Sequence, residues 1–510
     1  MIFRAPEESL EIPAVALTPF LMENAERSGD KPALIDAPSG RTLTYRGWAE
    51  SVRNAAAGLS RRGLRKGDVF AIYSPNLPEY AIAFHAVSLL GGIVTTINPA
   101  YTATELSRQL ADARARYLLT TPAFLNNAMQ AARENSLRDV FVFGDSFDAL
   151  LASDGDVPDV AIDPGNDVVA LPYSSGTTGL PKGVMLTHRN LVANVLQCAN
   201  VFGVGEDATI LAVLPFFHIY GMVVIMNLGL REGATIVTMP RFDLKECLQT
   251  LEKYRITYAY IVPPIMLALA KSPIVDDFDL SALRVLFSGA APLSEHIARA
   301  ASARLRCAIT QGYGMTETSP ATHATRRGET KGIGQPLPNT EAKIVSVTTG
   351  SELGPDQEGE ICVRGPQVMK GYLNNPDATA AMIDGDGWLH TGDIGSADES
   401  GCFFVVDRVK ELIKYKGMQI APAELEAVLL AHPAIADAAV VPLADEEAGQ
   451  VPKAFVVLKD ESTAEDIMTY VADRVARYKR VRYVEVIDQI PRSPSGKILR
   501  RVLVERDRAQ

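Results

Sequence analysis

Residues 173–188 read Tyr-Ser-Ser-Gly-Thr-Thr-Gly-Leu-Pro-Lys-Gly-Val-Met-Leu-Thr-His. Apolar, strand-like runs precede the loop at residues 168–171 and close it at residues 184–186. Glycine lets a backbone approach a ligand closely, and successive N–H groups in such a turn form an anion-binding hollow. Hydroxyl donors and a lysine supply the partners that phosphate oxygens require. The stretch therefore predicts a polyphosphate loop built from Ser174, Ser175, Gly176, Thr177, Thr178 and Lys182.

This loop differs from the Walker A loop, in which Gly-Lys-Ser/Thr follows four residues after a first glycine. Here Pro181 precedes Lys182, and Gly183 follows it. Composition alone leaves open a flexible surface connection between two strands, because Gly, Ser and Thr cluster in ordinary turns. The ordered string is more specific than its composition.

Length and charge limit the class of protein. The chain has 510 residues, which is more than one hydrophobic core accommodates, so we expect two or more domains. A formal net charge of −11 argues against nucleic acid as the main partner. The five cysteines are scattered and form no Cys-x-x-Cys pair, which argues against a disulfide framework or a metal site and fits a reducing cytosol.

The two ends of the chain carry no recognisable targeting signal. Residues 1–11 contain three glutamates and no apolar segment, so we expect no signal peptide. The apolar run at residues 81–97 is too short and too interrupted for a membrane span. Residues 507–510 do not match a peroxisomal address. These features predict a cytoplasmic protein without a membrane span.

Hydrophobic periodicity predicts an α/β fold. Strand-like and helix-like segments alternate over residues 42–121 and again over 208–310, which is typical of layered α/β domains with parallel strands. Residues 218–230 read as one long apolar helix in the second set. Short strands and turns over 340–406 predict a β-rich unit, and a small α+β domain follows. We therefore expect a large N-terminal domain, residues 1–407, and a small C-terminal domain, residues 408–510.

Four further groups of residues could carry chemistry. Tyr313 lies between two glycines and could stack on a base, and Glu317 is a hard oxygen ligand suited to Mg²⁺. His218 starts the apolar helix, where a histidine is more often a satisfied core residue than a catalyst. Asp393 lies near a loop and could accept hydrogen bonds from ribose hydroxyls. Lys497 stands on a turn of small residues and could reach a phosphate; otherwise it is simply exposed.

Taken together, these strings resemble one family. SSGTTGLPKG, QGYGMTE, HTGD, VDRVKELIKYKG and PRSPSGKILR occur in the order found in the adenylate-forming acyl- and aryl-CoA ligases. Within that superfamily the chain is most similar to the 4-coumarate–CoA ligases, over residues 42–501. The resemblance implies a two-step reaction, in which a carboxylate and ATP give an acyl-adenylate and pyrophosphate, and the thiol of coenzyme A then displaces AMP.

The same resemblance implies roles for individual residues. Thr178 and Glu317 are expected to support Mg²⁺, and Asp393 and Arg408 to bind ribose. The implied ATP- and AMP-binding residues are Ser174, Ser175, Gly176, Thr177, Thr178, Lys182, Ala290, Gln311, Gly312, Tyr313, Gly314, Thr316, Asp393, Arg408 and Lys410. Catalytic roles are implied for His218, Lys497, Lys414 and Gln419.

Members of this family rotate the small domain between the two steps, about the position that matches Lys410. One face presents Lys497 for adenylation, and the other presents a hairpin, residues 414–419, for thioester formation. Coenzyme A is then expected to contact Arg241, Lys416 and Gly417.

The resemblance also places an acyl pocket at Tyr220, Val223, Phe287, Gly289, Met315, Pro320 and Ala321, with Ile219, Met266, Gly312, Gly314 and Thr322 beside it. Plant coumarate ligases usually carry Asn, Lys, Val and Leu where this chain has Val223, Phe287, Ala321 and Thr322. These departures make the pocket more apolar and less suited to a hydroxylated ring. Cinnamate-type acids are the first expectation, and medium-chain fatty acids are the alternative.

Two other functions stay open at this point. A non-catalytic nucleotide-binding regulator could keep the same fold, although intact Lys182, Glu317 and Lys497 speak against it. A luciferase-like oxygenase that acts on an adenylate is a third hypothesis, which no residue favours. The expected partners are a small hydrophobic acid, ATP, Mg²⁺ and coenzyme A, in a monomer or homodimer.

Overall fold

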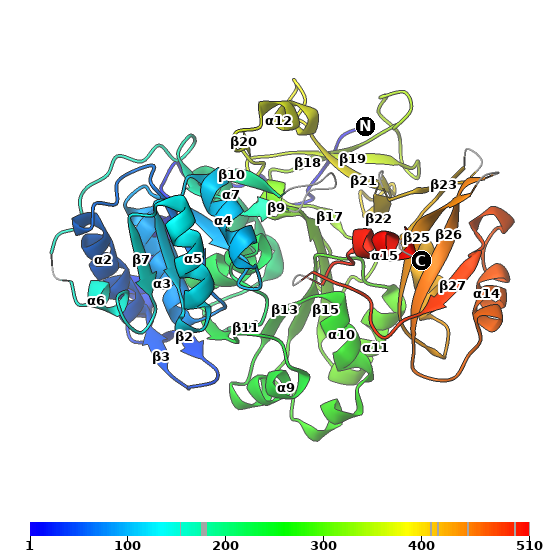
Figure 1. Cartoon of the computed structure of the whole chain (residues 1–510), viewed down its shortest axis with the longest axis horizontal. Coiled ribbons are helices and arrows are strands. Elements are labelled where there is room, and N and C mark those ends of the chain that lie inside the picture. Colours follow the sequence, from blue (N-terminus) through cyan, green and yellow to red (C-terminus); the bar gives the residue numbers. More distant parts are fainter. Residues whose placement is uncertain are drawn as a thin grey trace.

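Figure 1 shows the computed structural model of the chain. The structure describes residues 1–153, 155–174, 181–408, 411–415, 418–445, 448–493 and 496–508. Within these ranges the strands form four sheets, three in the N-terminal part and one in the C-terminal part. The C-terminal part, orange to red in Figure 1, lies at one end of the molecule beside the yellow β-rich unit.

The first large sheet has nine strands and is parallel through its centre. In spatial order they are β17 (Gln335–Pro336), β16 (Ala321–Ala324), β15 (Ala308–Gly314), β14 (Val285–Ser288), β13 (Tyr258–Ile261), β11 (Thr209–Ala212), β12 (Thr235–Thr238), β2 (Pro32–Asp36) and β3 (Thr42–Thr44). Antiparallel strands at both edges, β16–β17 and β3, depart from the all-parallel expectation.

The second large sheet has eight strands. They are β20 (Gly371–Tyr372), β10 (Lys182–Thr187), β8 (Val168–Ala170), β5 (Ile93–Ile97), β4 (Val69–Tyr73), β6 (Tyr117–Thr120) and β7 (Asp139–Val142), with β9 (Tyr173–Ser174) paired to β10. The strands that flank the phosphate loop are thus integral to this sheet, as their apolar residues predict.

Helices cover and separate the two large sheets. Those of the large domain are α1 (Leu17–Ser28), α2 (Tyr45–Arg61), α3 (Pro78–Leu89), α4 (Ala103–Ala113), α5 (Leu125–Asn135), α6 (Asp148–Leu151), α7 (His188–Phe202), α8 (Leu228–Arg231), α9 (Leu244–Lys253), α10 (Pro263–Lys271), α11 (Glu295–Leu305) and α12 (Pro376–Met382), with short 3₁₀ turns η1 (Pro122–Phe124), η3 (Pro273–Asp277) and η4 (Thr316–Thr318). Helix α3 contacts strands of both sheets and is buried on every face, which is why it reads as apolar all round. One continuous core therefore joins the two sheets.

A capping box starts the helix that follows the phosphate-loop stretch. The Thr187 hydroxyl accepts a hydrogen bond from the Asn190 N–H, and the Asn190 side chain accepts one from the Thr187 N–H. His188 lies behind this cap, where its Nδ1 accepts a hydrogen bond from Leu17 N at 3.1 Å. The stretch at 173–188 thus ends in two buried, hydrogen-bonded residues, Thr187 and His188, which fix its position in the fold.

The β-rich unit is an antiparallel sheet of five strands, in the order β1 (Phe3–Arg4), β18 (Glu341–Val345), β19 (Gly359–Arg364), β21 (Leu389–Ala397) and β22 (Phe403–Arg408). The sequence placed the residues around His390 and Asp393 near loops, and this was wrong. They lie within β21, where more and less buried residues alternate from Leu389 to Asp393.

The small domain packs helices on a separate sheet. Its elements are β23 (Ile413–Tyr415), β24 (Met418–Ile420), α13 (Pro422–Leu430), β25 (Ile435–Asp445), β26 (Gly449–Leu458), α14 (Ala464–Ala472), η5 (Arg477–Lys479), β27 (Tyr483–Val486) and α15 (Arg500–Arg508). The last strand of the β-rich unit ends at Arg408, and the next described strand belongs to this other sheet. A boundary after residue 407 and a hinge at Lys410 remain predictions, and Lys410 lies outside the described residues.

The long apolar helix expected at residues 218–230 is divided. A π-helix, η2 (Tyr220–Asn227), is followed by the short α8. A Cβ on Gly221 would lie 2.2 Å from the Pro215 carbonyl oxygen, so the chain enters this helix in close backbone contact. An all-apolar run does not reveal the change of helix type, which often marks a functional site. No helix in the described part of the chain combines the length and apolar character that crossing a bilayer requires.

Candidate active site

The candidate site lies at the carboxyl ends of β13, β14 and β15. These strands are neighbours in the nine-stranded sheet, and residues 262–264, 289–291 and 311–317 follow or end them. Ligands of open parallel sheets bind at this edge, because the loops there converge on one crevice. The structure therefore brings together three segments that lie far apart in the sequence.

The base of the phosphate loop is a short hairpin. Ser174 and Lys182 face each other in the antiparallel pair β9–β10. Lys182 thus begins a strand, and its Nζ lies 5.0 Å from the centre of the Tyr372 ring. Ser175, Gly176, Thr177 and Thr178 lie outside the described residues, so their roles remain predictions.

Glu317, the proposed metal ligand, is buried beside the same tyrosine. Only 3% of it is exposed, and Tyr372 Oη donates a hydrogen bond of 2.8 Å to its Oε1. Burial, together with the negative charge of Glu317, raises the pKa of Tyr372, so the hydroxyl stays protonated and donates. One tyrosine therefore connects the lysine expected to bind phosphate to the carboxylate expected to bind the metal. Sequence reasoning missed Tyr372, which lies in no motif.

A second tyrosine holds the proposed ribose-binding carboxylate. Tyr313 Oη donates a 2.5 Å hydrogen bond to Asp393 Oδ2. Asp393 is 5% exposed, and its backbone N–H is bonded to Thr391 Oγ1 at 3.1 Å. Arg408 stands directly opposite Asp393 on the neighbouring strand β22. The two residues proposed for ribose thus share one rung of a sheet.

Two glycines in β15 stand at positions where a side chain would collide with neighbouring residues. A Cβ on Gly312 would lie 2.4 Å from Cζ of Phe287, and a Cβ on Gly314 would lie 1.8 Å from the Pro320 oxygen. Gln311 is anchored beside them, since its side-chain amide donates to the Thr330 carbonyl at 3.2 Å. These glycines therefore let the strand lie close to its neighbours.

Ala290 adopts a left-handed backbone conformation, with φ of +68°. It is exposed, and it follows the end of β14. Such a conformation is uncommon for a residue other than glycine and often accompanies a ligand-binding turn. This conformation fits the proposed position of Ala290 at the adenine. Thr316 starts the 3₁₀ turn that carries Glu317.

His218 lies at the entrance to the π-helix. Its Nδ1 accepts the N–H of Tyr220 at 3.2 Å. Burial lowers the pKa of His218 to about 4, so the imidazole is neutral at neutral pH. A neutral ring whose Nδ1 is already an acceptor carries its proton on Nε2, and can donate a hydrogen bond there.

Aromatic rings line the proposed acyl pocket. The Phe287 ring lies 4.5 Å from that of Phe202 and 5.6 Å from that of Tyr260, measured between ring centres. Tyr220 Oη donates to the Phe287 carbonyl at 3.3 Å, and the Tyr220 ring covers Gly289. The pocket residues Val223, Met266, Ala321 and Thr322 are buried, as are Ile219 and Pro320. Met315 is half-buried.

Tyr260 is a pocket residue that sequence reasoning missed. It is 1% exposed, and its hydroxyl has no hydrogen-bond partner within the described ranges. A buried hydroxyl without a partner is costly, so it indicates a position where a ligand or water supplies one. The Ser288 hydroxyl, at the end of β14, is also buried without a hydrogen-bond partner within the described ranges.

Lys497 stands on a turn that rests on the large domain. Its N–H donates to Ser493 Oγ at 3.1 Å, and its carbonyl accepts the Ser493 N–H at 2.8 Å. Gly496 has a φ of +80°, and a Cβ there would lie 3.2 Å from Cγ2 of Val262. Arg492 joins the Gly496 carbonyl to the Asp437 carboxylate. The turn is therefore seated where β13 leads into α10, at the edge that holds the other site residues.

The remaining predicted residues are less closely placed. Lys414 and Gln419 pair across the β23–β24 hairpin, and the described part of this hairpin stops short of Lys416 and Gly417, which lie outside it. Arg241 is exposed on the large domain, with its Nη2 4.0 Å from Glu246 Oε1. The roles of these residues remain predictions.

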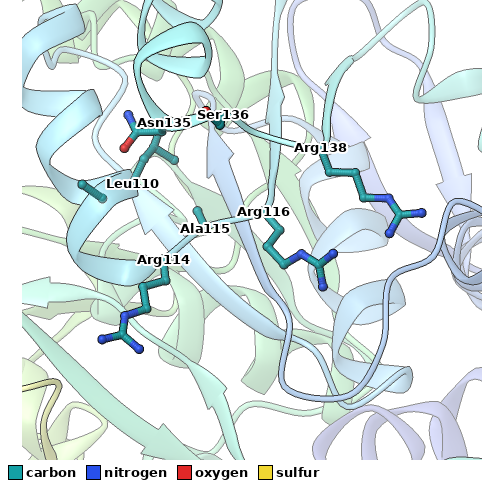
Figure 2. Close-up of a pocket in the computed structure, with 8 residues that line it drawn as sticks. Leu110, Arg114, Ala115, Arg116, Asn135, Ser136 and Arg138 are labelled. Carbon is teal, nitrogen blue, oxygen red and sulfur yellow. The ribbon is translucent and has the colours of Figure 1, made fainter.

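A separate surface pocket of about 380 Å³ lies where α4 and α5 lead into β6 and β7. It is lined by Leu110, Ala111, Arg114, Ala115, Arg116, Asn135, Ser136 and Arg138. Figure 2 shows that the Arg114 side chain points away from those of Arg116 and Arg138. Arg116 is already paired with Asp68 at 2.6 Å. No residue of the predicted site lines this pocket.

Comparison with known proteins places this geometry in one family. The model of the AMP-binding enzyme family matches residues 21–373, and that of the AMP-binding enzyme C-terminal domain matches residues 424–497. 4-Coumarate–CoA ligase 2 of Petroselinum crispum is 45% identical over 99% of this chain and 96% of its own length. 4-Coumarate–CoA ligase 5 of Oryza sativa subsp. japonica is 46% identical over 98% and 96%.

Comparison with solved structures agrees with this family assignment. The anthranilate CoA ligase AuaEII in complex with anthranoyl-AMP superposes with a TM-score of 0.90 at 26% identity, covering 98% of both chains. ATP-bound MatB from Rhodopseudomonas palustris superposes with a TM-score of 0.88 at 27% identity, covering 96% of this chain and 99% of its own. The resemblance drawn from the motifs is confirmed, and the chain belongs to the AMP-binding enzyme family of adenylate-forming ligases, close to the 4-coumarate–CoA ligases.

Proposed function

We propose that this protein is an ATP-dependent, AMP-forming acid–CoA ligase that acts on a 4-coumarate- or cinnamate-type acid. The observation that carries the proposal is identity of about 45% to curated 4-coumarate–CoA ligases along nearly the whole of both chains. In the first step the acid carboxylate attacks the α-phosphorus of ATP and pyrophosphate leaves. In the second the thiol of coenzyme A attacks the acyl carbon and AMP leaves.

The large domain provides the charges that phosphoryl transfer requires. Lys182 and the loop before it bind phosphate oxygens, where a lysine acts as a point charge. Glu317 and Thr178 hold Mg²⁺, which neutralises charge on the phosphates when it is bound. The buried carboxylate bonded to Tyr372 supports this role, because its geometry is set before the ligand arrives.

The nucleoside binds along the edge of β15 and β21. Asp393 accepts ribose hydroxyls, with Arg408 beside it, and the bond from Tyr313 orients the carboxylate. Adenine lies between residues 289–291 and 311–316, including Ala290, Gln311 and Thr316. The left-handed turn at Ala290 and the glycines of β15 support this placement.

The small domain supplies a different group in each step. Lys497 contacts the α-phosphate and acyl oxygens during adenylation, which its seat beside Val262 supports. Lys414 and Gln419 face the site during thioester formation, after a rotation about Lys410. His218 lies where the carboxylate and the thiol meet, and Arg241, Lys416 and Gly417 contact coenzyme A.

The acid lies among the aromatic rings around Phe287. A flat aromatic acid stacks well on such rings, and the unpartnered hydroxyl of Tyr260 offers a hydrogen bond to a ring substituent. Medium-chain fatty acids are the second candidate, because Val223 and Phe287 make the described wall apolar. ATP, coenzyme A and unpaired cysteines all fit the cytoplasm.

The test is pyrophosphate release with a panel of acids, followed by AMP release with and without coenzyme A. Cinnamate and 4-coumarate should give the highest kcat/KM, with octanoate as the competing substrate. Pyrophosphate release without CoA-dependent AMP release would contradict the ligase. ATP binding without any pyrophosphate release would instead support a nucleotide-binding regulator.

A further inference from the structure

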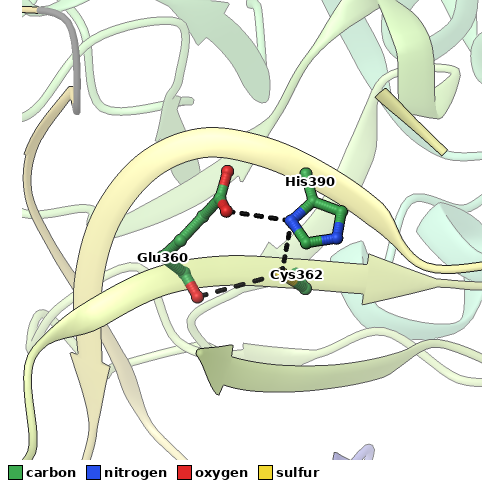
Figure 3. Close-up of side chains that lie close together, drawn as sticks. All are labelled: Glu360, Cys362 and His390. Atoms are coloured by element: carbon green, nitrogen blue, oxygen red, sulfur yellow. Dashed lines mark hydrogen bonds and ion pairs between the residues drawn. The ribbon is translucent and has the colours of Figure 1, made fainter. Parts of the chain in front are cut away.

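Three side chains of metal-ligand type meet in the β-rich unit, on the two neighbouring strands β19 and β21. Cys362 and His390 are direct partners in the antiparallel pair, and Glu360 lies two residues before the cysteine. Residues two apart on a strand share a face, and the register shifts between Glu360 and Cys362. The pairing therefore collects glutamate, cysteine and histidine on one face, as Figure 3 shows.

The ligand atoms are close enough for a single ion. His390 Nδ1 lies 2.9 Å from Glu360 Oε2 and 3.5 Å from Cys362 Sγ, and the three atoms lie within 4.8 Å of one another. Bonds of roughly 2.0–2.3 Å from one tetrahedral zinc ion to nitrogen, oxygen and sulfur ligands require nearly this spacing. Small side-chain adjustments would complete the geometry.

The other nitrogen of the same imidazole is also held. His390 Nε2 lies 3.5 Å from Asp384 Oδ2, and the other oxygen of Asp384 accepts the N–H groups of Asp386 and Trp388, each at 2.9 Å. Metal-binding histidines nearly always donate their second ring nitrogen to a carboxylate or carbonyl, which fixes the ring. This arrangement is independent of the three ligands and orients Nδ1 toward them.

The site is reachable from solvent on one side. The side chain of His390 is 32% exposed and that of Glu360 is 19% exposed, while Cys362 is fully buried behind them. Three protein ligands with an exposed side leave room for a water as the fourth ligand. Burial raises the pKa of the Cys362 thiol to about 12, so without a metal this sulfur is an inert thiol.

We propose that Glu360, Cys362 and His390 form a binding site for a borderline-soft divalent ion of the Zn²⁺ type. Binding replaces one proton, that of the Cys362 thiol, which goes to solvent, while His390 binds through Nδ1 as the neutral imidazole with its ring proton on Nε2, facing Asp384. One thiolate and one carboxylate then neutralise the divalent charge. The thiolate selects against Mg²⁺, which prefers oxygen ligands.

This site is separate from the proposed Mg²⁺ position at Glu317, but it adjoins the nucleotide. Glu360 Oε1 accepts the backbone N–H of Gly392 at 2.9 Å, and Gly392 precedes Asp393. An ion bound to Glu360 would therefore lie close to Gly392, the residue next to the proposed ribose contact Asp393. The site itself does not depend on the ligase function.

The experiment uses Co²⁺ as a probe on the purified full-length chain, in buffer with excess Mg²⁺. We expect one equivalent of Co²⁺ to produce the near-ultraviolet absorption of a thiolate–cobalt bond, and Zn²⁺ to displace it. Cys362→Ser should abolish this absorption. Cys402→Ser, which changes a cysteine at the edge of the same unit, should retain it.

Two further variants test the site without changing the buried cysteine, whose replacement could disturb folding. Glu360→Gln and Asp384→Asn keep the buried thiol, and each should weaken Co²⁺ binding by about 10–100-fold. Circular dichroism checks that both remain folded. Thiolate absorption that persists in Cys362→Ser, the absence of saturable binding to the unaltered chain, or unchanged affinity in both carboxylate variants would overturn the proposal.

Discussion

The two sides of the candidate site are held in different ways. On the large domain, Glu317 and Asp393 are buried carboxylates, and each accepts a hydrogen bond from a tyrosine hydroxyl. On the small domain, Lys497 stands on a turn in which its backbone N–H bonds to Ser493 Oγ, and Gly496 of this turn lies against Val262 of the large domain. The two carboxylates of the candidate site are therefore held in place before any ligand binds, whereas Lys497 belongs to the domain that we propose rotates between the two steps.

Lys497→Ala tests this contrast most strongly. If Lys497 stabilises charge only during adenylation, its loss should lower pyrophosphate release by about 10²–10³-fold. Thioester formation from supplied acyl-adenylate should be nearly unchanged, because that step uses the other face. Single-turnover assays of each half-reaction measure the two effects separately.

The matched control is Arg501→Ala, which removes an exposed cation four residues along the chain. It should leave both half-reactions unaltered. Lys416→Ala should show the reverse of Lys497→Ala, with the loss mainly in the coenzyme A step. Equal damage to both steps by Lys497→Ala and Lys416→Ala would contradict the two-face assignment.

Tyr372→Phe tests the large-domain side of the site, where tyrosine hydroxyls hold the buried carboxylates. The change removes the 2.8 Å hydrogen bond from Tyr372 to the buried Glu317 carboxylate and keeps the ring beside Lys182. A hydrogen bond to a charged group contributes about 1.5–3 kcal/mol, so adenylation should fall by about 10–100-fold. The Mg²⁺ dependence of pyrophosphate release should shift to higher concentration.

Tyr173→Phe is the control for that variant, since it removes a tyrosine hydroxyl from an exposed carboxylate, Asp112. Its effect should be small, because exposed polar contacts are screened by water. If both tyrosine variants behaved alike, the preorganised carboxylate would not explain the difference between the two sides.

Acid should destabilise the large domain. Burial lowers the pKa of His85 to about 3 and that of His218 to about 4, against an ordinary value of 6.5. As the pH falls below 6.5, these histidines take up protons in the unfolded chain but not in the folded chain. The free energy of unfolding therefore keeps its full value above pH 6.5 and decreases below it. Each such histidine contributes a slope of about 1.4 kcal/mol per pH unit down to its folded-state pKa.

Urea unfolding between pH 7 and pH 4.5 measures this slope. His85→Gln should make it shallower, whereas His432→Gln, on the small domain, should leave it unchanged. A slope that His85→Gln does not alter would show that His85 does not resist protonation.

Tyr260→Phe should have the smallest effect, and it tests whether the pocket recognises the ring hydroxyl of the acid. Removing this hydroxyl should lower kcat/KM for 4-coumarate by about 2–10-fold, the range expected for one neutral hydrogen bond. The value for cinnamate, which lacks the ring hydroxyl, should not fall. Equal losses for both acids would place the hydroxyl outside the reach of the ring substituent.

The sequence predicted those parts of the fold in which periodicity is clear. The alternation over residues 42–121 matches β4, α3, β5, α4 and β6 closely. It failed at the π-helix, because an apolar run carries no periodic signal of helix type. It also failed at β21, where His390 and Asp393 look like loop residues but alternate between a polar and a buried face.

The sequence proposed site residues where they occur in contiguous motifs. Lys182, Glu317, Asp393 and Lys497 each belong to such a string. Tyr372 and Tyr260 do not, because their relation to the site arises from strand pairing and not from spacing along the chain. The same reason hid Cys362 and His390, which are 28 residues apart and become neighbours only in the sheet.

The rung shared by Asp393 and Arg408 has a mechanical consequence. Arg408 is the last residue of β22, so the proposed hinge at Lys410 comes two residues after the proposed ribose contact. If the small domain pivots there, points near the ribose contact move little, while the distant turns of the small domain move far. Under this proposal, the small domain exchanges its two faces while a bound nucleotide stays nearly still.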